Sequence, residues 1–161
     1  MKIKTNSLII NASAGHGKDY TTEIIKKNST NECEIISFSE TIKNIISRNI
    51  PYSIQKKYPN LDHKEILNIL KDERHDLKVF GDWNMRQFLQ EFMGNNILRE
   101  INPTINILFT AQKMKNILEK NNNIIFLCND NRYENEQEFL LKFNQVPFNS
   151  KIDYLNDFIE D

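Results

Sequence analysis

Near its N-terminal end the chain reads Leu8-Ile9-Ile10-Asn11-Ala12-Ser13-Ala14-Gly15-His16-Gly17-Lys18-Asp19. An apolar run stops at a loop of small residues, which holds two of the chain's four glycines and ends in Gly17-Lys18. An amphipathic stretch follows over residues 20–27. This order predicts a strand, a phosphate-binding loop and a helix, the arrangement that holds the phosphates of a nucleotide. We therefore interpret the chain as a protein that binds a nucleoside triphosphate, with a kinase as the first hypothesis.

The residue types of this loop suit a polyphosphate. Backbone N–H groups approach an anion closely only where side chains are small, as at Ala14, Gly15 and Gly17. The helix that starts near Lys18 would direct the positive end of its dipole at the same anion. The Lys18 ammonium would bridge the β- and γ-phosphates as a point charge, whereas His16 is interpreted as a loop side chain without an acid–base role.

The loop matches the pattern G-x-x-x-x-G-K-[ST] only in part. Ala12 stands where the pattern has its first glycine, and Asp19 stands where a Ser or Thr hydroxyl would reach Mg²⁺. A carboxylate is itself a hard oxygen ligand, so Asp19 could contact the metal directly or through water. The alternative is an ordinary strand–turn–helix whose glycines serve only the turn.

Length and composition predict one domain over residues 1–161 and limit its partners. The net charge is −1 and the isoelectric point about 6.3, which removes the bulk electrostatic case for polymeric nucleic acid or an anionic membrane. The sequence contains no apolar run near the roughly 18 residues of a membrane span and no signal-peptide pattern. Cys33 and Cys128 lie in apolar stretches and are predicted to be buried thiols in a reducing compartment, the cytoplasm.

Three short apolar runs predict buried strands of the parallel type, over residues 8–11, 34–38 and 124–128. Stretches with helical spacing separate these runs. Strands that alternate with helices predict an α/β fold with a short parallel sheet flanked by helices.

Local signals mark helix starts and loops between the strands. Asp62 with Glu65 resembles a capping box, and Asp82 is the predicted cap of the next helix. A loop is predicted between the prolines at positions 51 and 59. The aromatic residues of the helix after Asp82 are interpreted as core rather than as a platform for a base; they are Trp83, Phe88 and Phe92.

A second polar group follows the third predicted strand. Asp130 lies just past its carboxyl end, the edge at which open α/β sheets bind ligands. If this strand neighbours the first one, Asp130 faces the phosphate loop and could hold Mg²⁺, directly or through water. Arg132 could neutralise charge on a transferring group. A turn aspartate beside a solvated arginine is the alternative.

Arg86 and Gln90 are four residues apart and share a helix face that is not the apolar one. Gly94 allows a turn, and Arg99 follows it. Two arginines and an amide near a bend could bind a monophosphate and a base edge, because arginine presents a bidentate fork. Solvated surface side chains are the alternative for these residues and for Lys43, which lies on the helix after the second strand.

Four blocks, in this order, resemble the deoxynucleoside monophosphate kinases of bacteriophages and other large DNA viruses. The first is the loop that ends in Gly17-Lys18-Asp19. The second, Ser37-Phe38-Ser39-Glu40-Thr41-Ile42-Lys43, is similar to a stretch in which a strand end leads to a small residue, a turn and a helix with a lysine. The third comprises Arg86-Gln87-Phe88-Leu89-Gln90, Gly94, Arg99 and Asn102-Pro103, and the fourth is Asp130-Asn131-Arg132-Tyr133-Glu134-Asn135-Glu136. These blocks cover most of residues 7–143.

The resemblance implies a P-loop NTPase-type three-layer fold and transfer of the γ-phosphate of ATP, with Mg²⁺, to a deoxynucleoside monophosphate. The ATP phosphates would lie on Ala14, Gly15, His16, Gly17, Lys18, Asp19 and Tyr20. Lys18, Asp130 and Arg132 would be the catalytic residues, and Asp19 and Asp130 would serve the metal. The acceptor nucleotide would be bound by Lys43, Arg86, Gln90 and Arg99. A viral protein of this kind would act in the host cytoplasm, and a homodimer is left open.

Departures from the family's pattern keep two alternatives open. Ala12 replaces a glycine, Tyr20 stands where the viral enzymes usually have threonine, and Thr104-Ile105-Asn106 lacks their acidic-x-Trp. The first alternative is therefore a kinase fold retained as a binding or assembly subunit without catalysis. An aromatic residue at position 20 looks more like animal-type phosphomevalonate kinases, so a small-molecule kinase of that type is the second.

Overall fold

The computed structural model describes residues 6–10, 17–72, 76–95 and 97–160. The chain divides into two compact units, residues 1–38 with 106–161 and residues 39–105, so the second unit is an insertion in the sequence of the first. The single domain expected over residues 1–161 stays a prediction, since compactness does not tell whether a unit folds alone. Within the described residues, no helix combines the length and the apolar character needed to cross a membrane.

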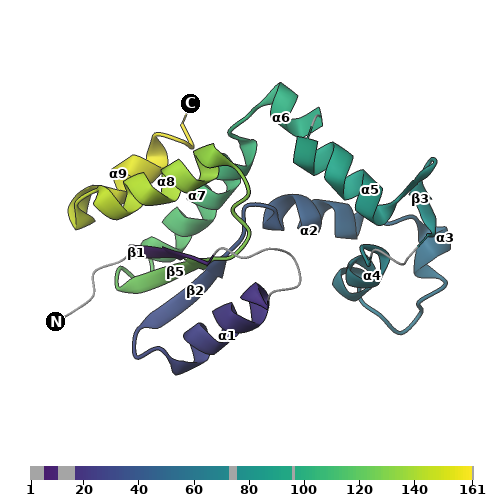
Figure 1. The fold of residues 1–161 in the computed structure, drawn as a ribbon, viewed down its shortest axis with the longest axis horizontal. Coiled ribbons are helices and arrows are strands. Elements are labelled where there is room, and N and C mark those ends of the chain that lie inside the picture. The colour runs from purple at the N-terminus through teal and green to yellow at the C-terminus, as the bar shows by residue number, and fades with distance from the viewer. Residues whose placement is uncertain (1–5, 11–16, 73–75, 96, 161) are drawn as a thin grey trace. The chain divides into compact units, whose positions relative to one another are not determined.

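The first unit is built on a parallel sheet of three strands, β1 (Asn6–Ile9), β2 (Glu32–Ile36) and β5 (Ile124–Cys128). Their order is β1-β5-β2, so β5 lies in the middle (Figure 1). The predicted α/β class and short parallel sheet are confirmed. The third strand has its predicted bounds, whereas the first two begin two residues earlier than expected.

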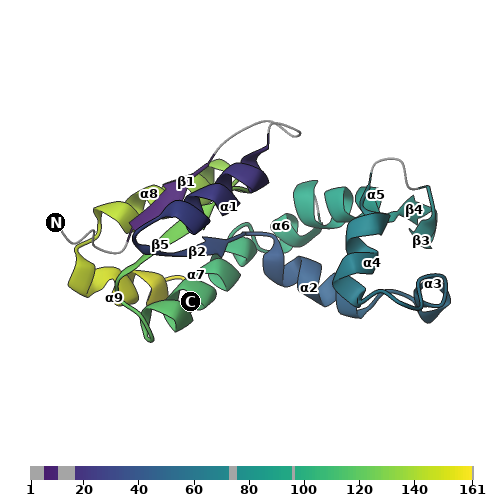
Figure 2. The same cartoon turned by 90° about the horizontal axis from the view of Figure 1, so that it is seen from below.

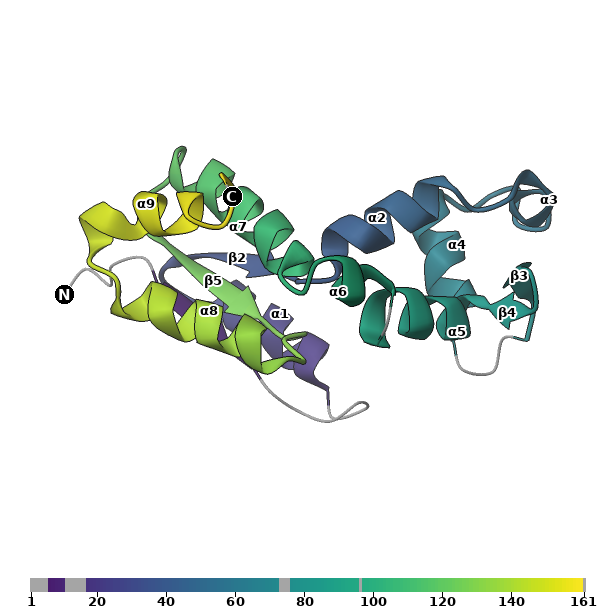
Figure 3. The same ribbon diagram turned by 90° about the horizontal axis from the view of Figure 1, so that it is seen from above.

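Helices cover both faces of this sheet. Figure 2 shows α1 (Lys18–Asn28) in front of the strands, and Figure 3, from the opposite side, shows α7 (Ile105–Leu118), α8 (Glu134–Gln145) and α9 (Lys151–Asn156). A single 3₁₀ turn, η2 (Phe148–Ser150), joins the last two helices. The first unit therefore has three layers.

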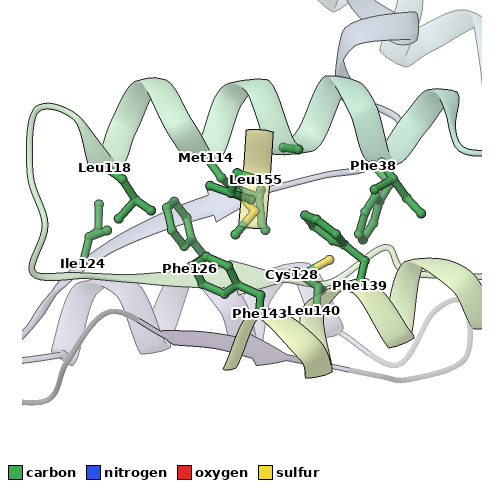
Figure 4. Close-up of a cluster of buried hydrophobic side chains, with 13 residues drawn as sticks. Phe38, Met114, Leu118, Ile124, Phe126, Cys128, Phe139, Leu140, Phe143 and Leu155 are labelled. Carbon is green, nitrogen blue, oxygen red and sulfur yellow. The ribbon is translucent and has the colours of Figure 1, made fainter. Parts of the chain in front are cut away.

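The main core lies between the sheet and α7, α8 and α9 (Figure 4). Successive residues of a strand point to opposite faces, so Phe126 and Cys128 face this core while Leu127 faces α1. Phe126 meets Phe143 of α8 edge to face at 5.9 Å between ring centroids, and both side chains are fully buried. The predicted burial of both thiols is confirmed, because Cys33 and Cys128 are buried and free.

Strand β1 lies at one edge of the described sheet, and a side chain covers that edge. The Ser7 N–H donates to Oδ1 of Asn144 at 2.7 Å, and Nδ2 of Asn144 donates to the Ser7 carbonyl at 3.0 Å. Asn144, on α8, therefore makes the two backbone hydrogen bonds that a neighbouring strand would make. Covering an open edge in this way prevents unwanted strand pairing.

The second unit contains α2 (Glu40–Arg48), α3 (Tyr52–Gln55), α4 (His63–Leu70), β3 (Lys78–Phe80), β4 (Trp83–Asn84), α5 (Met85–Leu89), the π-helix η1 (Gln90–Asn95) and α6 (Ile97–Ile101). The capping box at the start of α4 is confirmed, because Glu65 N–H donates to Asp62 Oδ1 at 2.8 Å and Asp62 N–H to Glu65 Oε2 at 2.7 Å. The segment between the two prolines is not only a loop, since α3 forms within it.

Two further expectations in this unit are wrong. Asn84, not Asp82, caps α5, because Gln87 N–H donates to Asn84 Oδ1 at 2.8 Å. Asp82 instead lies in the turn between β3 and β4, where Gly81 takes a left-handed φ of 59°. Trp83 is 39% exposed rather than core, and Phe88, half-buried, stacks on Phe92 at 5.1 Å between ring centroids.

Candidate functional site

The candidate site lies at the carboxyl ends of the strands in the first unit. The chain enters α1 through Gly17, which has φ 71° and ψ 23°. Such a left-handed conformation is accessible to glycine at little cost. A Cβ there would meet nothing within 4 Å, so the backbone conformation, not space, explains the glycine. Ala14, Gly15 and His16 lie outside the described residues.

The first turn of helix α1 carries both Lys18 and Asp19 and has no side-chain cap. Its first helical hydrogen bond runs from Thr21 N–H to the Gly17 carbonyl at 2.8 Å. Gly17 has no side chain that could accept hydrogen bonds from the N–H groups of the first turn. Lys18, half-buried, is the first residue of the helix and therefore lies at the positive end of the helix dipole. Tyr20, 73% exposed, points largely into solvent. This helix start has the chemistry that attracts an anion.

The strand order brings Asp130 to the same edge. The condition set in the sequence analysis, that the third strand neighbours the first, is met, because Ile9 pairs with Cys128 in parallel register. One further hydrogen bond, from Ile10 N–H to the Cys128 carbonyl at 2.7 Å, extends this pairing. The residues after β5 therefore leave the sheet at the carboxyl end of β1, the end where α1 and α8 begin (Figure 3).

The Asp130 carboxylate joins the ends of β5 and β2. Its Oδ1 accepts from Phe38 N–H at 3.0 Å, and its Oδ2 accepts from the Ser37 hydroxyl. Both oxygens thus accept from the segment that follows β2. A carboxylate oxygen carries more than one lone pair, so these bonds still permit contact with a metal or its water.

A second contact, not expected from sequence, ties Asp19 to the segment after β5. Nδ2 of Asn129 donates to Oδ1 of Asp19 at 2.7 Å. The only sequence signal for Asn129 is its position directly before Asp130 at the end of a buried strand. The contact connects the first turn of α1 with the loop that carries Asp130 and Arg132.

The side chain of Arg132 is exposed, and its backbone N–H is hydrogen-bonded to the buried carboxylate of Glu136. The Arg132 N–H donates to Oε2 of Glu136 at 2.9 Å, and Glu136 is only 1% exposed. Glu136 lies in the first turn of α8, where a carboxylate interacts favourably with the helix dipole. Sequence reasoning noted Glu136 only within the fourth block of the resemblance and assigned it no role.

Cys128, between these elements, is an inert thiol. Burial raises its pKa from 9.0 to about 12, and the negative charge of Asp130 acts in the same direction. Its Sγ lies 3.8 Å from Asp130 Oδ1. Because the thiolate is the reactive form, Cys128 is not a nucleophile near neutral pH.

The residues predicted for the acceptor nucleotide belong to the second unit. Gln90 N–H donates to the Arg86 carbonyl, so these residues are one helical turn apart, as predicted. Arg86 is half-buried, with Nη1 3.5 Å from the Lys71 carbonyl, and Arg99 is half-buried on α6. Lys43 lies on α2, where its N–H donates to the Ser39 carbonyl at 3.0 Å. Lys18, Asp19, Asp130 and Arg132 belong to the first unit.

The carboxylate oxygens at this edge of the sheet suit a hard cation whose remaining ligands are phosphate oxygens and water. Asp19 and Asp130 supply carboxylate oxygens, which Mg²⁺ prefers. Over residues 6–10, 17–72, 76–95 and 97–160, no group of three or more His, Cys, Asp or Glu side chains could hold a metal ion. Two carboxylates fit Mg²⁺ that arrives on nucleotide phosphates and keeps several waters, rather than an ion held in a protein cage.

No family model, curated protein or solved structure matches the chain. The four sequence blocks therefore carry the family resemblance by themselves. The arrangement at the carboxyl ends of β1, β2 and β5 is observed independently of that resemblance.

Proposed function

We propose that the chain is an ATP-dependent kinase that phosphorylates a deoxynucleoside monophosphate to the diphosphate. One observation carries the proposal: β1, which precedes Gly17-Lys18 in the sequence, pairs in parallel with β5, which ends at Cys128, two residues before Asp130. A helix start with a lysine and a segment with a carboxylate thus follow neighbouring parallel strands. Open α/β sheets bind nucleotide phosphates at this edge.

In this proposal the first turn of α1 holds the triphosphate. The N–H groups of the turn and the Lys18 ammonium face negative charge on the β- and γ-phosphates. Phosphoryl transfer depends on positioning and electrostatic stabilisation more than on a strong base. Lys18 therefore contributes most when charge builds on the transferring group.

Asp19 and Asp130 are the residues that would hold Mg²⁺, directly or through water. When bound, Mg²⁺ neutralises charge on the phosphate oxygens. Asp130 is kept in place by Ser37 and Phe38, and Asp19 by Asn129. These hydrogen bonds would restrict the directions in which both carboxylates point.

The acceptor nucleotide would be bound by side chains of the second unit. Arg86, Gln90 and Arg99 suit a phosphate and a base edge, since arginine binds phosphate with two parallel hydrogen bonds. Arg132 would neutralise charge between donor and acceptor. These roles rest on the resemblance and on the fork geometry of arginine.

Melting temperatures test donor and acceptor separately. A ligand at about 100 times its dissociation constant stabilises by about 2.7 kcal/mol, which predicts a shift of roughly 5–10 °C for a chain of this size. We expect shifts with Mg·ATP and with one deoxynucleoside monophosphate, and formation of the diphosphate from that pair. Mg·ATP without any shift would refute the proposal.

A binding or assembly subunit without catalysis is the second candidate, and the exposed Tyr20 beside the helix start favours it. A large exposed aromatic side chain is typical of interaction surfaces. Little stabilisation by Mg·ATP, and none by any deoxynucleoside monophosphate, would support this candidate. Phosphomevalonate belongs in the same acceptor panel, because its phosphorylation would identify the small-molecule kinase.

A further inference from the structure

The two carboxylates at the site are held in different ways. Asp130 accepts hydrogen bonds on both oxygens, from Ser37 and Phe38, and so fastens β5 to the end of β2. Asp19 lies on the exposed first turn of α1 and accepts from Asn129 on Oδ1. The Asp130 carboxylate therefore links two strand ends, whereas the Asp19 carboxylate is oriented by the Asn129 amide.

The backbone of Asn129 is held on both sides. Asn129 follows Cys128, which is fully buried at the end of β5, and precedes Asp130, which Ser37 and Phe38 hold. Its backbone therefore lies between two fixed residues. An ionised carboxylate only accepts hydrogen bonds, so the Asn129 amide must present Nδ2, not Oδ1, to Asp19.

The hydrogen bond restricts the torsions of Asp19. An exposed aspartate otherwise samples several rotamers, and ordering a side chain costs free energy. Because a carboxylate is planar, a hydrogen bond to Oδ1 also sets the direction of Oδ2. The neutral amide orients the Asp19 carboxylate and leaves its negative charge in place. A lysine or arginine partner would neutralise that charge.

We propose that Asn129 is a positioning residue, which orients the Asp19 carboxylate toward the Mg²⁺ that accompanies the nucleotide. This inference rests on the proposed function. The competing explanation is structural: Asn129 only fastens α1 to the segment after β5, and its loss would lower stability without regard to Mg²⁺.

The test measures the Mg²⁺ dependence of ATP binding rather than activity. The melting shift at fixed ATP is titrated with MgCl₂ for the wild type, Asn129→Ala, Asp19→Ala and the double variant. Asn28→Ala is the matched control, since it removes another amide hydrogen bond of α1, 2.9 Å from Nδ2 to the Ile24 carbonyl. Loss of a residue that hydrogen-bonds to a metal ligand typically costs tenfold or more in metal affinity.

We expect Asn129→Ala to raise the Mg²⁺ midpoint about tenfold. The melting temperature without ligand and the ATP shift in EDTA should stay close to those of Asn28→Ala. Asn129→Ala should add nothing in the Asp19→Ala background, because a residue that acts through Asp19 has no target there.

Two results would overturn the inference while leaving nucleotide binding intact. One is an unchanged Mg²⁺ midpoint in Asn129→Ala, and the other is an increase that adds to that of Asp19→Ala. A wild-type protein that shows no ATP shift at any MgCl₂ concentration would instead refute the proposed function, and the role of Asn129 with it.

Discussion

Ser37 and Asp130, 93 residues apart in the sequence, are joined by a hydrogen bond from the hydroxyl to Oδ2. The Phe38 N–H donates to the other oxygen of the same carboxylate at 3.0 Å. This pair fixes the ends of two neighbouring parallel strands to each other. We therefore expect these hydrogen bonds to contribute to the stability of the fold, whether or not Asp130 takes part in catalysis.

Removing Ser37 or Asp130 should lower stability by different amounts. Ser37→Ala loses one hydrogen bond to a charged group, which predicts a loss of about 1–2 kcal/mol in the free energy of unfolding, measured in urea. Asp130→Ala leaves both donors without their acceptor and should cost about 2–4 kcal/mol. Ser53→Ala, at an exposed position of α3, is the control and should change stability by less than about 0.5 kcal/mol. Equal effects of Ser37→Ala and Ser53→Ala would show that the bond contributes little.

Lys18→Ala should reduce turnover about 10²-fold or more, because it removes a preorganised charge at the transferring phosphate. The measurement is the rate of diphosphate formation at saturating Mg·ATP. Lys27→Ala, an exposed lysine in the last turn of the same helix, is the matched control and should retain the wild-type rate within a factor of two. A Lys18→Ala rate within a few-fold of the wild type would contradict the role given to Lys18.

Cys128 should make the protein lose stability at alkaline pH. Burial raises its pKa from 9.0 to about 12, so the folded state retains the thiol proton between these values while the unfolded state releases it. The thiol therefore contributes stability that is fully present below pH 9 and is lost as the pH rises toward 12. One such group contributes a slope of at most about 1.4 kcal/mol per pH unit.

Urea unfolding at several pH values measures this slope. Cys128→Ala should be less stable than the wild type at pH 7 because of the small cavity, yet should lose less stability between pH 9 and 11. Burial also raises the pKa of Tyr154 to about 12, but Tyr154 is present in both proteins, so its contribution cancels in the difference. Parallel pH profiles for the two proteins would disprove the prediction.

Glu136→Ala should destabilise the first unit by about 1–3 kcal/mol, because it leaves the Arg132 N–H without its buried acceptor. Glu136→Gln keeps an acceptor oxygen and should cost less. Glu138→Ala, at an exposed position of the same helix, serves as the control. Amide hydrogen exchange at Arg132 offers a direct measurement, and protection that survives in Glu136→Ala would exclude this hydrogen bond as its source.

Local patterns in the sequence predicted much of the fold. Short apolar runs marked all three strands of the first unit, and the pair Asp62 and Glu65 marked the start of α4. The start of α5 was predicted at Asp82, which instead lies in the turn with Gly81. The helix therefore begins later, and Asn84 caps it. Trp83 belongs to the short β4, where a large side chain stays partly exposed.

The polar contacts of the site were less accessible to prediction. Asp130 was found because it follows a buried strand, a local signal that needs only one rule about strand ends. Asn129 and Asp19 are 110 residues apart, and nothing near either residue indicates its partner. The burial of Glu136 was equally hard to predict. An acid in the first turn of a helix is usually solvated, and only tertiary packing buries this one.

The amide of Asn144 also governs how the protein meets other molecules. An exposed strand edge can act as a template for β-aggregation, since its free backbone groups recruit further strands. Here an incoming strand would first have to displace Asn144 from both backbone groups of Ser7. Fibril growth from the β1 edge of the sheet is thereby disfavoured.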